Sequence, residues 1–192
     1  MGLRFTFGEK GGEKLFQGNL ECKQCVAHKA DGTRCKRKTC KMLPYCYQHT
    51  QSELGVKVGA STIQGAGQGL FATKTFKGSD ANKKWIAPLS GQRISGAEVD
   101  RRYADATAPY TVSEKKKNWD GALKRYVGHY ANSKFGKHKK SVLKGTNAEI
   151  ALHHDVPWLK AQMGKIIKPY KEILAYYGRQ YRLEKDYYST TR

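Results

Sequence analysis

Short apolar segments interrupted by glycine, proline and asparagine dominate the chain from about Gly55 onward. Runs of this length, bounded by turn-forming residues, are typical of β-strands. The pattern changes at Ser95–Tyr103, where a serine followed three residues later by Glu98 predicts a short capped helix. Many short strands and few helices predict a mainly β fold. Strands are expected at Gly55–Ala60, Gly69–Phe76, Trp85–Leu89, Ser141–Leu152, Gly164–Ile167 and Lys171–Tyr177.

The first fifty residues follow a different pattern. Residues 1–20 are glycine-rich and mixed in charge, and they predict an arm or a short edge strand. Residues 21–50 carry all five cysteines with almost no aliphatic bulk, so this segment cannot build a core without help. We therefore expect the 192 residues to divide into an arm, a small module and one full-sized β-rich domain.

Charge narrows the choice of partners. The 36 lysines and arginines outnumber the 16 aspartates and glutamates, which gives a net charge of +20. A field of this strength favours a polyanionic partner, with DNA as the first candidate. We expect the contact surfaces to be Arg34–Lys41, Lys115–Lys117 and Lys134–Lys144, and we expect Glu114–Lys117 and Lys134–Lys144 to be exposed loops. The alternative is that these stretches form a solvated face that only keeps the protein soluble.

Apolar runs long enough for a transmembrane helix are absent, and the chain does not open with a signal-peptide pattern. We therefore expect a protein that is not secreted and that acts in the nucleus or cytoplasm. The opening Met1–Thr6 matches the N-myristoylation pattern, which leaves attachment to a membrane surface as a further alternative.

The cysteines predict a metal site. All five lie between Cys22 and Cys46, whereas a disulfide framework would be spread over the fold that it links. With His49 they offer six potential ligands, and zinc needs four in a tetrahedron. The run from Gln24 to His49 resembles a small finger with three cysteines and one histidine that is found in many viral and microbial proteins. That resemblance selects Cys25, Cys35, Cys46 and His49 as zinc ligands.

Two alternatives to this ligand set remain. In the first, Cys22 replaces Cys35 and forms a pair with Cys25. In the second, the segment is a basic loop whose thiols bind no metal.

The glycine-rich stretch Gly65–Gly69 is a weak signal by itself, because glycines permit turns as well as close approach to a ligand. Its setting in Ser61–Ala72 resembles the opening motif of SET-domain lysine methyltransferases. Further segments similar to that family's motifs follow in order, and the resemblance covers roughly residues 55–181, which leaves residues 182–192 as a tail. These segments are Leu89–Ser95 with Glu98–Asp100, Trp119–Asp120, Gly128–Ser133, Thr146–Glu149 and Lys171–Gly178.

The resemblance implies a fold of small sheets with a C-terminal pseudoknot, and it implies S-adenosylmethionine as the cofactor. Tyr177 would lie where the cofactor meets the substrate lysine and would be the catalytic residue, with Tyr110 as a second aromatic residue of the lysine channel. The alternative for Tyr177 is a core aromatic residue, and the alternative for His129 is a solvent-facing basic residue. The cofactor would be bound by Ala66, Gly67, Gln68, Gly69, His129, Tyr130, Asn132 and Tyr177.

The chain departs from the family pattern at several positions. Leu89 stands where most relatives have a tyrosine that lines the lysine channel, and Ser133 replaces the histidine that follows the asparagine. A basic insertion, Lys134–Gly145, replaces a short link. The family's cysteine-rich flanking modules are missing, so Tyr181 or Tyr187 is a candidate to close the cofactor pocket instead.

The expected function is methylation of a protein lysine, with a histone or another chromatin protein as substrate. A chain of charge +20 repels a free basic tail, but DNA that carries the tail would attract it. The main alternative is a non-catalytic chromatin or nucleic-acid adaptor built on the same scaffold, which Leu89 and Ser133 favour. The compact domain and the finger resemble those of large DNA viruses and microbial eukaryotes, so a viral factory or virion is a further possible location.

Overall fold

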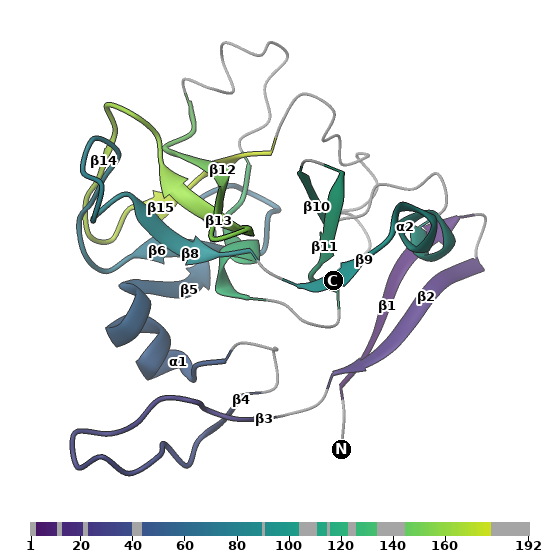
Figure 1. Ribbon diagram of the computed structural model, residues 1–192, viewed down its shortest axis with the longest axis horizontal. Coiled ribbons are helices and arrows are strands. Elements are labelled where there is room, and N and C mark those ends of the chain that lie inside the picture. The colour runs from purple at the N-terminus through teal and green to yellow at the C-terminus, as the bar shows by residue number, and fades with distance from the viewer. Residues whose placement is uncertain are drawn as a thin grey trace.

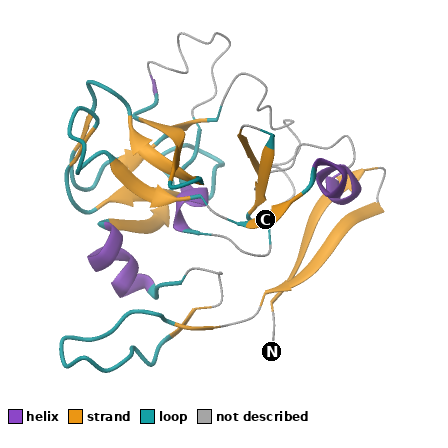
Figure 2. Ribbon diagram, in the orientation of Figure 1, coloured by secondary structure: helices purple, strands orange, loops and turns teal. Residues whose placement is uncertain are grey.

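The computed structural model describes residues 3–10, 13–20, 23–39, 44–89, 91–103, 111–114, 116–122, 126–133 and 145–177. Strands predominate within these ranges and form six small sheets of two to four strands each (Figure 1; Figure 2). The predicted mainly β fold of small sheets is therefore confirmed. None of the helices in these ranges is long and apolar enough to cross a membrane.

The N-terminal arm is a β-hairpin. Its strands β1 (Leu3–Lys10) and β2 (Glu13–Leu20) pair antiparallel from one end to the other. Figure 1 shows the hairpin beside helix α2 (Gly96–Tyr103). Two eight-residue strands exceed the short edge strand that was predicted, although the alternation of apolar and polar residues in β1 runs only from Leu3 to Phe7.

The cysteine-rich segment leads directly into the main domain. Its two short strands, β3 (Lys23–Gln24) and β4 (Lys38–Thr39), pair antiparallel. A helical stretch follows, in which α1 (Tyr47–His49) continues as the π-helical turn η1 (Thr50–Leu54). Gly55 ends this stretch with a left-handed backbone at φ 71°, a conformation that favours glycine. Figure 1 shows the helical stretch between the β3–β4 loop and the main domain.

The main domain contains four of the six sheets. Its short helical turn η2 (Val127–Tyr130) precedes the last third of the strands. The strands are β5 (Val56–Ala60), β6 (Gln68–Ala72), β7 (Phe76–Lys77), β8 (Trp85–Pro88), β9 (Gln92–Ile94), β10 (Thr111–Glu114), β11 (Lys117–Asp120), β12 (Ala148–His153), β13 (Val156–Ala161), β14 (Ile166–Ile167), β15 (Glu172–Ile173) and β16 (Ala175–Tyr176).

Strands near the end of the described chain pair with strands near the start of the main domain. The sheet orders are β15-β6-β5, β14-β7, β16-β12-β13-β8 and β10-β11-β9. β15 pairs antiparallel with β6, whereas β16 runs parallel to β12. The first and last motifs of the sequence are thereby brought to the same place.

One apolar core joins these sheets. Leu70, Ile86, Leu89, Leu159 and Ile173 come from four separate segments, and each is at most 1% exposed. Complete burial of a side chain of this size stabilises the fold by about 1.5–3 kcal/mol. The core therefore holds the small sheets together although no sheet exceeds four strands among the described residues.

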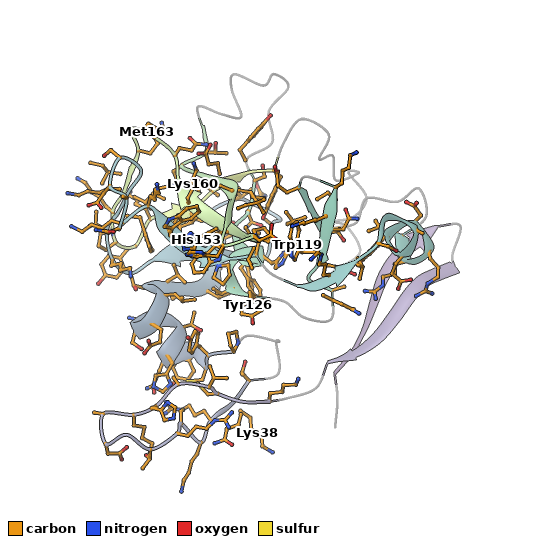
Figure 3. The ribbon with its side chains drawn as sticks, viewed as in Figure 1. Lys38, Trp119, Tyr126, His153, Lys160 and Met163 are labelled. Atoms are coloured by element: carbon orange, nitrogen blue, oxygen red, sulfur yellow. The ribbon has the colours of Figure 1, made fainter. Side chains whose placement is uncertain are left out.

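A buried ion pair anchors α2 to β11. The Asp120 carboxylate is 0% exposed and accepts hydrogen bonds from Arg102 Nη1 at 2.7 Å and from the Tyr103 hydroxyl at 2.9 Å. Burial and the neighbouring Asp120 charge raise the pKa of Tyr103, so its hydroxyl stays protonated and keeps donating. The neighbouring Trp119, labelled in Figure 3, is buried beside this pair.

Several predicted elements differ in extent from the observed ones. The helix at residues 95–103 is confirmed, because Ser95 Oγ accepts the Glu98 amide at 3.1 Å and α2 follows. The predicted strand Gly69–Phe76 is instead divided between β6 and β7. Strands β10, β11 and β13 were not predicted, whereas β9 lies in Leu89–Ser95, which resembles a strand motif of the SET family. The stretch Glu114–Lys117 is the end of a hairpin, where Lys116 is exposed with a φ of 61°, whereas Lys134–Lys144 lies outside the described residues.

Candidate active site and metal centre

The C-terminal segment is held between two asparagine-containing segments. On one side, the Ala175 amide donates to the Asn132 carbonyl at 2.8 Å, next to a parallel bridge between Asn132 and Leu174. On the other side, the amides of Asn147 and Ala148 donate to the Leu174 carbonyl at 2.9 and 3.0 Å. This arrangement is the one that a C-terminal pseudoknot requires.

The Asn147 side chain strengthens this contact. Its Nδ2 donates to the Glu172 carbonyl and its Oδ1 accepts the Leu174 amide, both at 2.9 Å. A carboxamide that bonds a backbone carbonyl and a backbone amide in this way replaces a strand partner. Asn147 lies in the predicted Thr146–Glu149 motif, but its role had not been predicted.

Glu172 is the polar centre of the site. Its carboxylate, 7% exposed, accepts hydrogen bonds from Ser61 Oγ at 2.7 Å, from the Thr62 amide at 2.7 Å and from the Thr62 hydroxyl. Burial tends to raise the pKa of Glu172, but the hydrogen bonds from Thr62 and Ser61 outweigh burial and lower it. A buried carboxylate therefore fixes the start of the glycine loop to the C-terminal segment.

Asn132 completes the same cluster. Its Nδ2 lies 2.9 Å from the Gln68 carbonyl, 3.0 Å from Ser61 Oγ and 3.3 Å from Glu172 Oε1. The carboxamide of Asn132 thus holds the knot to the glycine loop. The contact of Asn132 with a cofactor stays a prediction, and its Nδ2 and its backbone carbonyl both bond protein atoms here.

The predicted cofactor-binding loop divides into an open part and a packed part. Gly65 and Gly67 have left-handed backbones, with φ of 78° and 66°, and a Cβ at either position would meet no atom within 4 Å. Gly69 is packed, because a Cβ there would lie 2.3 Å from Glu172 Oε1. Ala66 is half-buried and Gln68 is exposed. The open part is therefore a cradle into which a ligand can approach the backbone closely.

The predicted aromatic residues lie along the knot. Tyr130, at the end of η2, and Tyr177 are both half-buried against the core, and the Tyr177 hydroxyl donates a hydrogen bond to the Ala131 carbonyl. The ring of His129 packs on Gly121, since a Cβ there would lie 2.6 Å from His129 Nε2. The structure thus brings these predicted residues to one region, whereas Tyr110, Tyr181 and Tyr187 lie outside the described residues.

Leu89 is a core residue. It is 0% exposed, its amide donates to the Pro157 carbonyl at 2.8 Å, and it packs against Gly128. The position that the SET resemblance aligns with a channel tyrosine is therefore filled by an aliphatic side chain of the core.

The predicted metal ligands converge. The ligand atoms of Cys25, Cys35, Cys46 and His49 all lie within 4.8 Å of one another, and Nδ1 of His49 is 3.5 Å from Cys25 Sγ and 3.4 Å from Cys46 Sγ. The three sulfurs are buried, which suits a closed structural site. This cluster could hold one metal ion, and Cys22, the alternative ligand, lies outside the described residues.

Local hydrogen bonds favour thiolate at this cluster. Burial tends to raise the pKa of Cys46, but hydrogen bonds from the His49 and Gln48 amides and the His49 ring lower it to about 7. Burial and the neighbouring Cys46 raise the pKa of Cys25, although the Cys46 amide donates to its sulfur at 3.2 Å. Cys46 thus forms a thiolate more readily than Cys25 does.

We call the cysteine-rich segment, described over residues 23–39 and 44–50, the metal module. A groove of about 590 Å³ lies between this module and the main domain. Arg37, Lys38 and Tyr47 line it on the module side, and Lys38 is labelled in Figure 3. Gln68 and Tyr130 line it on the main-domain side. The groove therefore reaches Gln68, which follows the open part of the glycine loop.

Comparison with known proteins gives matches in structure but not in sequence. No family model and no curated protein sequence match this chain. The methyltransferase domain of human PR domain-containing protein 2 is similar at 19% identity and a TM-score of 0.46, over 71% of this chain and 87% of that one. A chain of ctPRC2 in an autoinhibited conformation bound to S-adenosylmethionine is similar at 20% identity and a TM-score of 0.45, over 65% of this chain.

Chaetomium thermophilum Polycomb Repressive Complex 2 gives a similar result, with 20% identity and a TM-score of 0.46 over 64% of this chain. The present chain spans only 15% and 16% of these two Polycomb chains. These similarities concern the backbone fold alone.

Proposed function

We propose that this protein is an S-adenosylmethionine-dependent protein lysine methyltransferase. The observation that carries the proposal is the knot, in which the predicted catalytic Tyr177 and the predicted cofactor residues of two distant motifs meet. Tyr177 bonds the Ala131 carbonyl, and Asn132 bonds the carbonyl of Gln68 in the glycine loop. Six motif segments that resemble those of the SET family, in the same order along the sequence, support the same conclusion.

The cradle fits the proposed cofactor. S-adenosylmethionine, when bound, supplies a methyl group activated by its positively charged sulfur. The open backbone at Gly65–Gly67 would hold the methionine end together with Gln68, while Tyr130 and the backbone of Asn132 would border the cofactor. Gly69 would keep the loop close to Glu172, because any side chain there would push the two apart.

Tyr177 would orient the reacting groups. Its hydroxyl donates a hydrogen bond to the Ala131 carbonyl, so its oxygen would act toward a substrate as an acceptor. Such an oxygen can accept weak C–H···O contacts from a polarised methyl group. The substrate amine must lose a proton from a usual pKa of about 10.4, and an aromatic, water-poor channel favours that loss. Alignment of nitrogen and methyl within about 3–3.5 Å supplies much of the remaining rate.

For the substrate we propose a lysine of a histone or of another chromatin protein. The exposed cations Arg34, Lys36, Arg37 and Lys38 on the metal module, together with the net charge of +20, favour a substrate presented on DNA. Action on chromatin would take place in the nucleus, or in a cytoplasmic viral factory if the protein is viral.

We further propose that the cysteine and histidine cluster holds one structural zinc ion. Three thiolates and one imidazole form a donor set that zinc prefers, and the four ligand atoms are close enough to share one ion. The module has little apolar core of its own, since its buried residues are Cys25, Ala27, Cys35 and Cys46. Metal binding would then supply most of its folding free energy.

The second candidate function is a non-catalytic adaptor. The burial of Leu89 in the core favours it, because the channel lacks a tyrosine from that position. Cofactor binding separates the two candidates, since an adaptor need not bind S-adenosylmethionine.

The decisive experiment is a methyl-transfer assay on core histones and on nucleosomes, followed by mass spectrometry of the products. We expect lysine methylation by the wild-type protein that exceeds that of the Tyr177→Phe variant. Absence of cofactor binding by the wild-type protein would overturn the enzyme proposal in favour of the adaptor.

A further inference from the structure

The groove between the metal module and the main domain is lined by cationic and aromatic residues. Three cationic side chains, those of Arg37, Lys38 and Lys57, line it, and none of its twelve described lining residues is acidic. Tyrosines contribute from both sides, with Tyr47 on the module and Tyr130 on η2. A groove of this composition suits a small ligand that combines a negative charge with an apolar body.

The cation nearest to Tyr47 is held in place before any ligand arrives. Nη1 of Arg37 donates to Gln48 Oε1, and its guanidinium lies over the Tyr47 ring, 5.3 Å from the ring centroid. A guanidinium fixed in this way loses little conformational entropy when it binds a carboxylate, to which it can donate two parallel hydrogen bonds. Tyr47 itself is 72% exposed.

The far wall of the groove belongs to the proposed cofactor site. Gln68 follows the open cradle at Gly65–Gly67, and Tyr130 precedes Asn132 by two residues. A ligand in the cradle would therefore extend one end into the groove. In S-adenosylmethionine the methionine end carries the carboxylate, which is the negative group that the cations of the groove could pair with.

We propose that the metal module forms part of the cofactor site, with Arg37 binding the carboxylate of S-adenosylmethionine in this groove. The inference rests on the proposed function and adds a cofactor-binding residue outside the SET-like region.

The test measures binding by calorimetry with two ligands, S-adenosylmethionine and its decarboxylated analogue. For the wild-type protein we expect the analogue to bind about tenfold more weakly or worse, because it lacks the carboxylate. For Arg37→Gln we expect the same loss with S-adenosylmethionine and less than about a threefold change with the analogue. Such non-additivity identifies a direct interaction between the two groups.

Controls separate this interaction from general damage. Lys36→Gln removes a neighbouring exposed charge that does not line the groove, and it should leave both affinities unchanged. Metal content and thermal midpoint of Arg37→Gln should equal those of the wild-type protein. A loss of metal would show that the module itself had failed, and Lys57→Gln, on β5 and outside the module, then tests the same groove by the same ligand pair.

Three outcomes would count against the inference. If the wild-type protein binds S-adenosylmethionine and neither Arg37→Gln nor Lys57→Gln changes its affinity, the groove plays no part and only the inference fails. If Arg37→Gln instead weakens binding of a DNA duplex and leaves the cofactor affinity intact, the groove belongs to a nucleic-acid surface. If the wild-type protein binds no cofactor, the proposed function fails as well.

Discussion

The hydroxyl of Tyr177 donates a hydrogen bond to the backbone carbonyl of Ala131, one residue before Asn132. This bond ties the end of the described chain to the segment that follows η2, and it orients the only tyrosine hydroxyl that the SET resemblance assigns to the chemistry among the described residues. Because the bond joins the two halves of the knot, its loss can be measured in both catalysis and stability.

Tyr177→Phe should reduce methyl transfer by about 10²-fold or more while cofactor affinity changes by less than about tenfold. The ring still packs against the core, and only the hydroxyl that orients the reacting methyl group is lost. Tyr176→Phe is the matched control and should retain most of the activity. The opposite result, in which Tyr176→Phe is the inactive variant, would mean that the closing motif is aligned one residue out of place.

Asn132→Ala should destabilise the fold by about 2–3 kcal/mol and abolish tight cofactor binding, because three polar groups near its amide lose their donor. Thermal unfolding measures the first effect and calorimetry the second. Asn118→Ala removes a half-buried carboxamide whose Oδ1 accepts a hydrogen bond from the Ser113 hydroxyl, and it should change the midpoint little. An unchanged midpoint for Asn132→Ala would contradict the role given to this side chain.

Purified protein should contain about one equivalent of zinc, and Cys46→Ser should remove most of it. Elemental analysis of protein prepared without chelators measures this directly. Cys22→Ser serves as the control and also tests the alternative ligand set, since it should keep its zinc if Cys25, Cys35, Cys46 and His49 are the ligands. Zinc loss from Cys22→Ser with retention in Cys35→Ser would establish the other set.

Glu172→Gln should lower the free energy of unfolding near neutral pH by about 2 kcal/mol, because charge-assisted bonds from Ser61 and Thr62 weaken. The folded state lowers the pKa of Glu172, so its contribution is complete above the unfolded pKa of about 4.3 and is lost as the pH falls through the folded pKa. The difference between the two proteins should therefore shrink below about pH 4.

Denaturant titrations of the wild-type protein and of Glu172→Gln at several pH values measure how this difference in the free energy of unfolding changes. Glu149→Gln is the control, because the Glu149 side chain is 40% exposed and forms a surface ion pair with Lys160. It should change stability by less than about 1 kcal/mol at any pH. A constant difference between wild-type protein and Glu172→Gln at every pH would show that the carboxylate charge is not what stabilises the knot.

Duplexes of unrelated sequence should bind with similar affinity, and the affinity should fall steeply as salt rises. Lys36→Gln combined with Lys38→Gln should weaken binding and reduce the salt slope by about two, if the metal module contacts phosphates. Lys165→Gln combined with Lys168→Gln, beside β14 on the main domain, is the control of equal charge. An affinity for DNA that does not change with salt concentration would mean that the positive charge serves only solubility.

Features that depend on neighbouring residues could be predicted from the sequence. The Ser95–Glu98 cap is local, and it begins α2 as expected. The four metal ligands were selected through the resemblance to a small Cys3His finger, in which Cys46 and His49 form a pair that is local in the sequence. The glycine loop could be located by composition, although its division into open Gly67 and packed Gly69 could not.

Features that depend on distant pairing could not be predicted in this way. β9 and β11 pair Arg93 with Trp119, and both strands are too polar and too short to show a strand pattern. Glu172 had no predicted role because its partners Ser61 and Thr62 lie at the other end of the domain. The available signal was that Glu172 is the only acidic residue of the closing motif, where an unpaired buried charge would be costly.

The pairing of β15 with β6 has a consequence for how the protein is made. Ser61 and Glu172 are 111 residues apart in the sequence, yet they belong to the same small sheet region and share a hydrogen bond. A ribosome must therefore release almost the whole domain before its first sheet can be completed, and β6 waits with an open edge during that time. Contacts of such long sequence separation slow folding and expose nascent chains to aggregation. We therefore expect this topology to affect the need for chaperones during synthesis more than the stability of the folded domain.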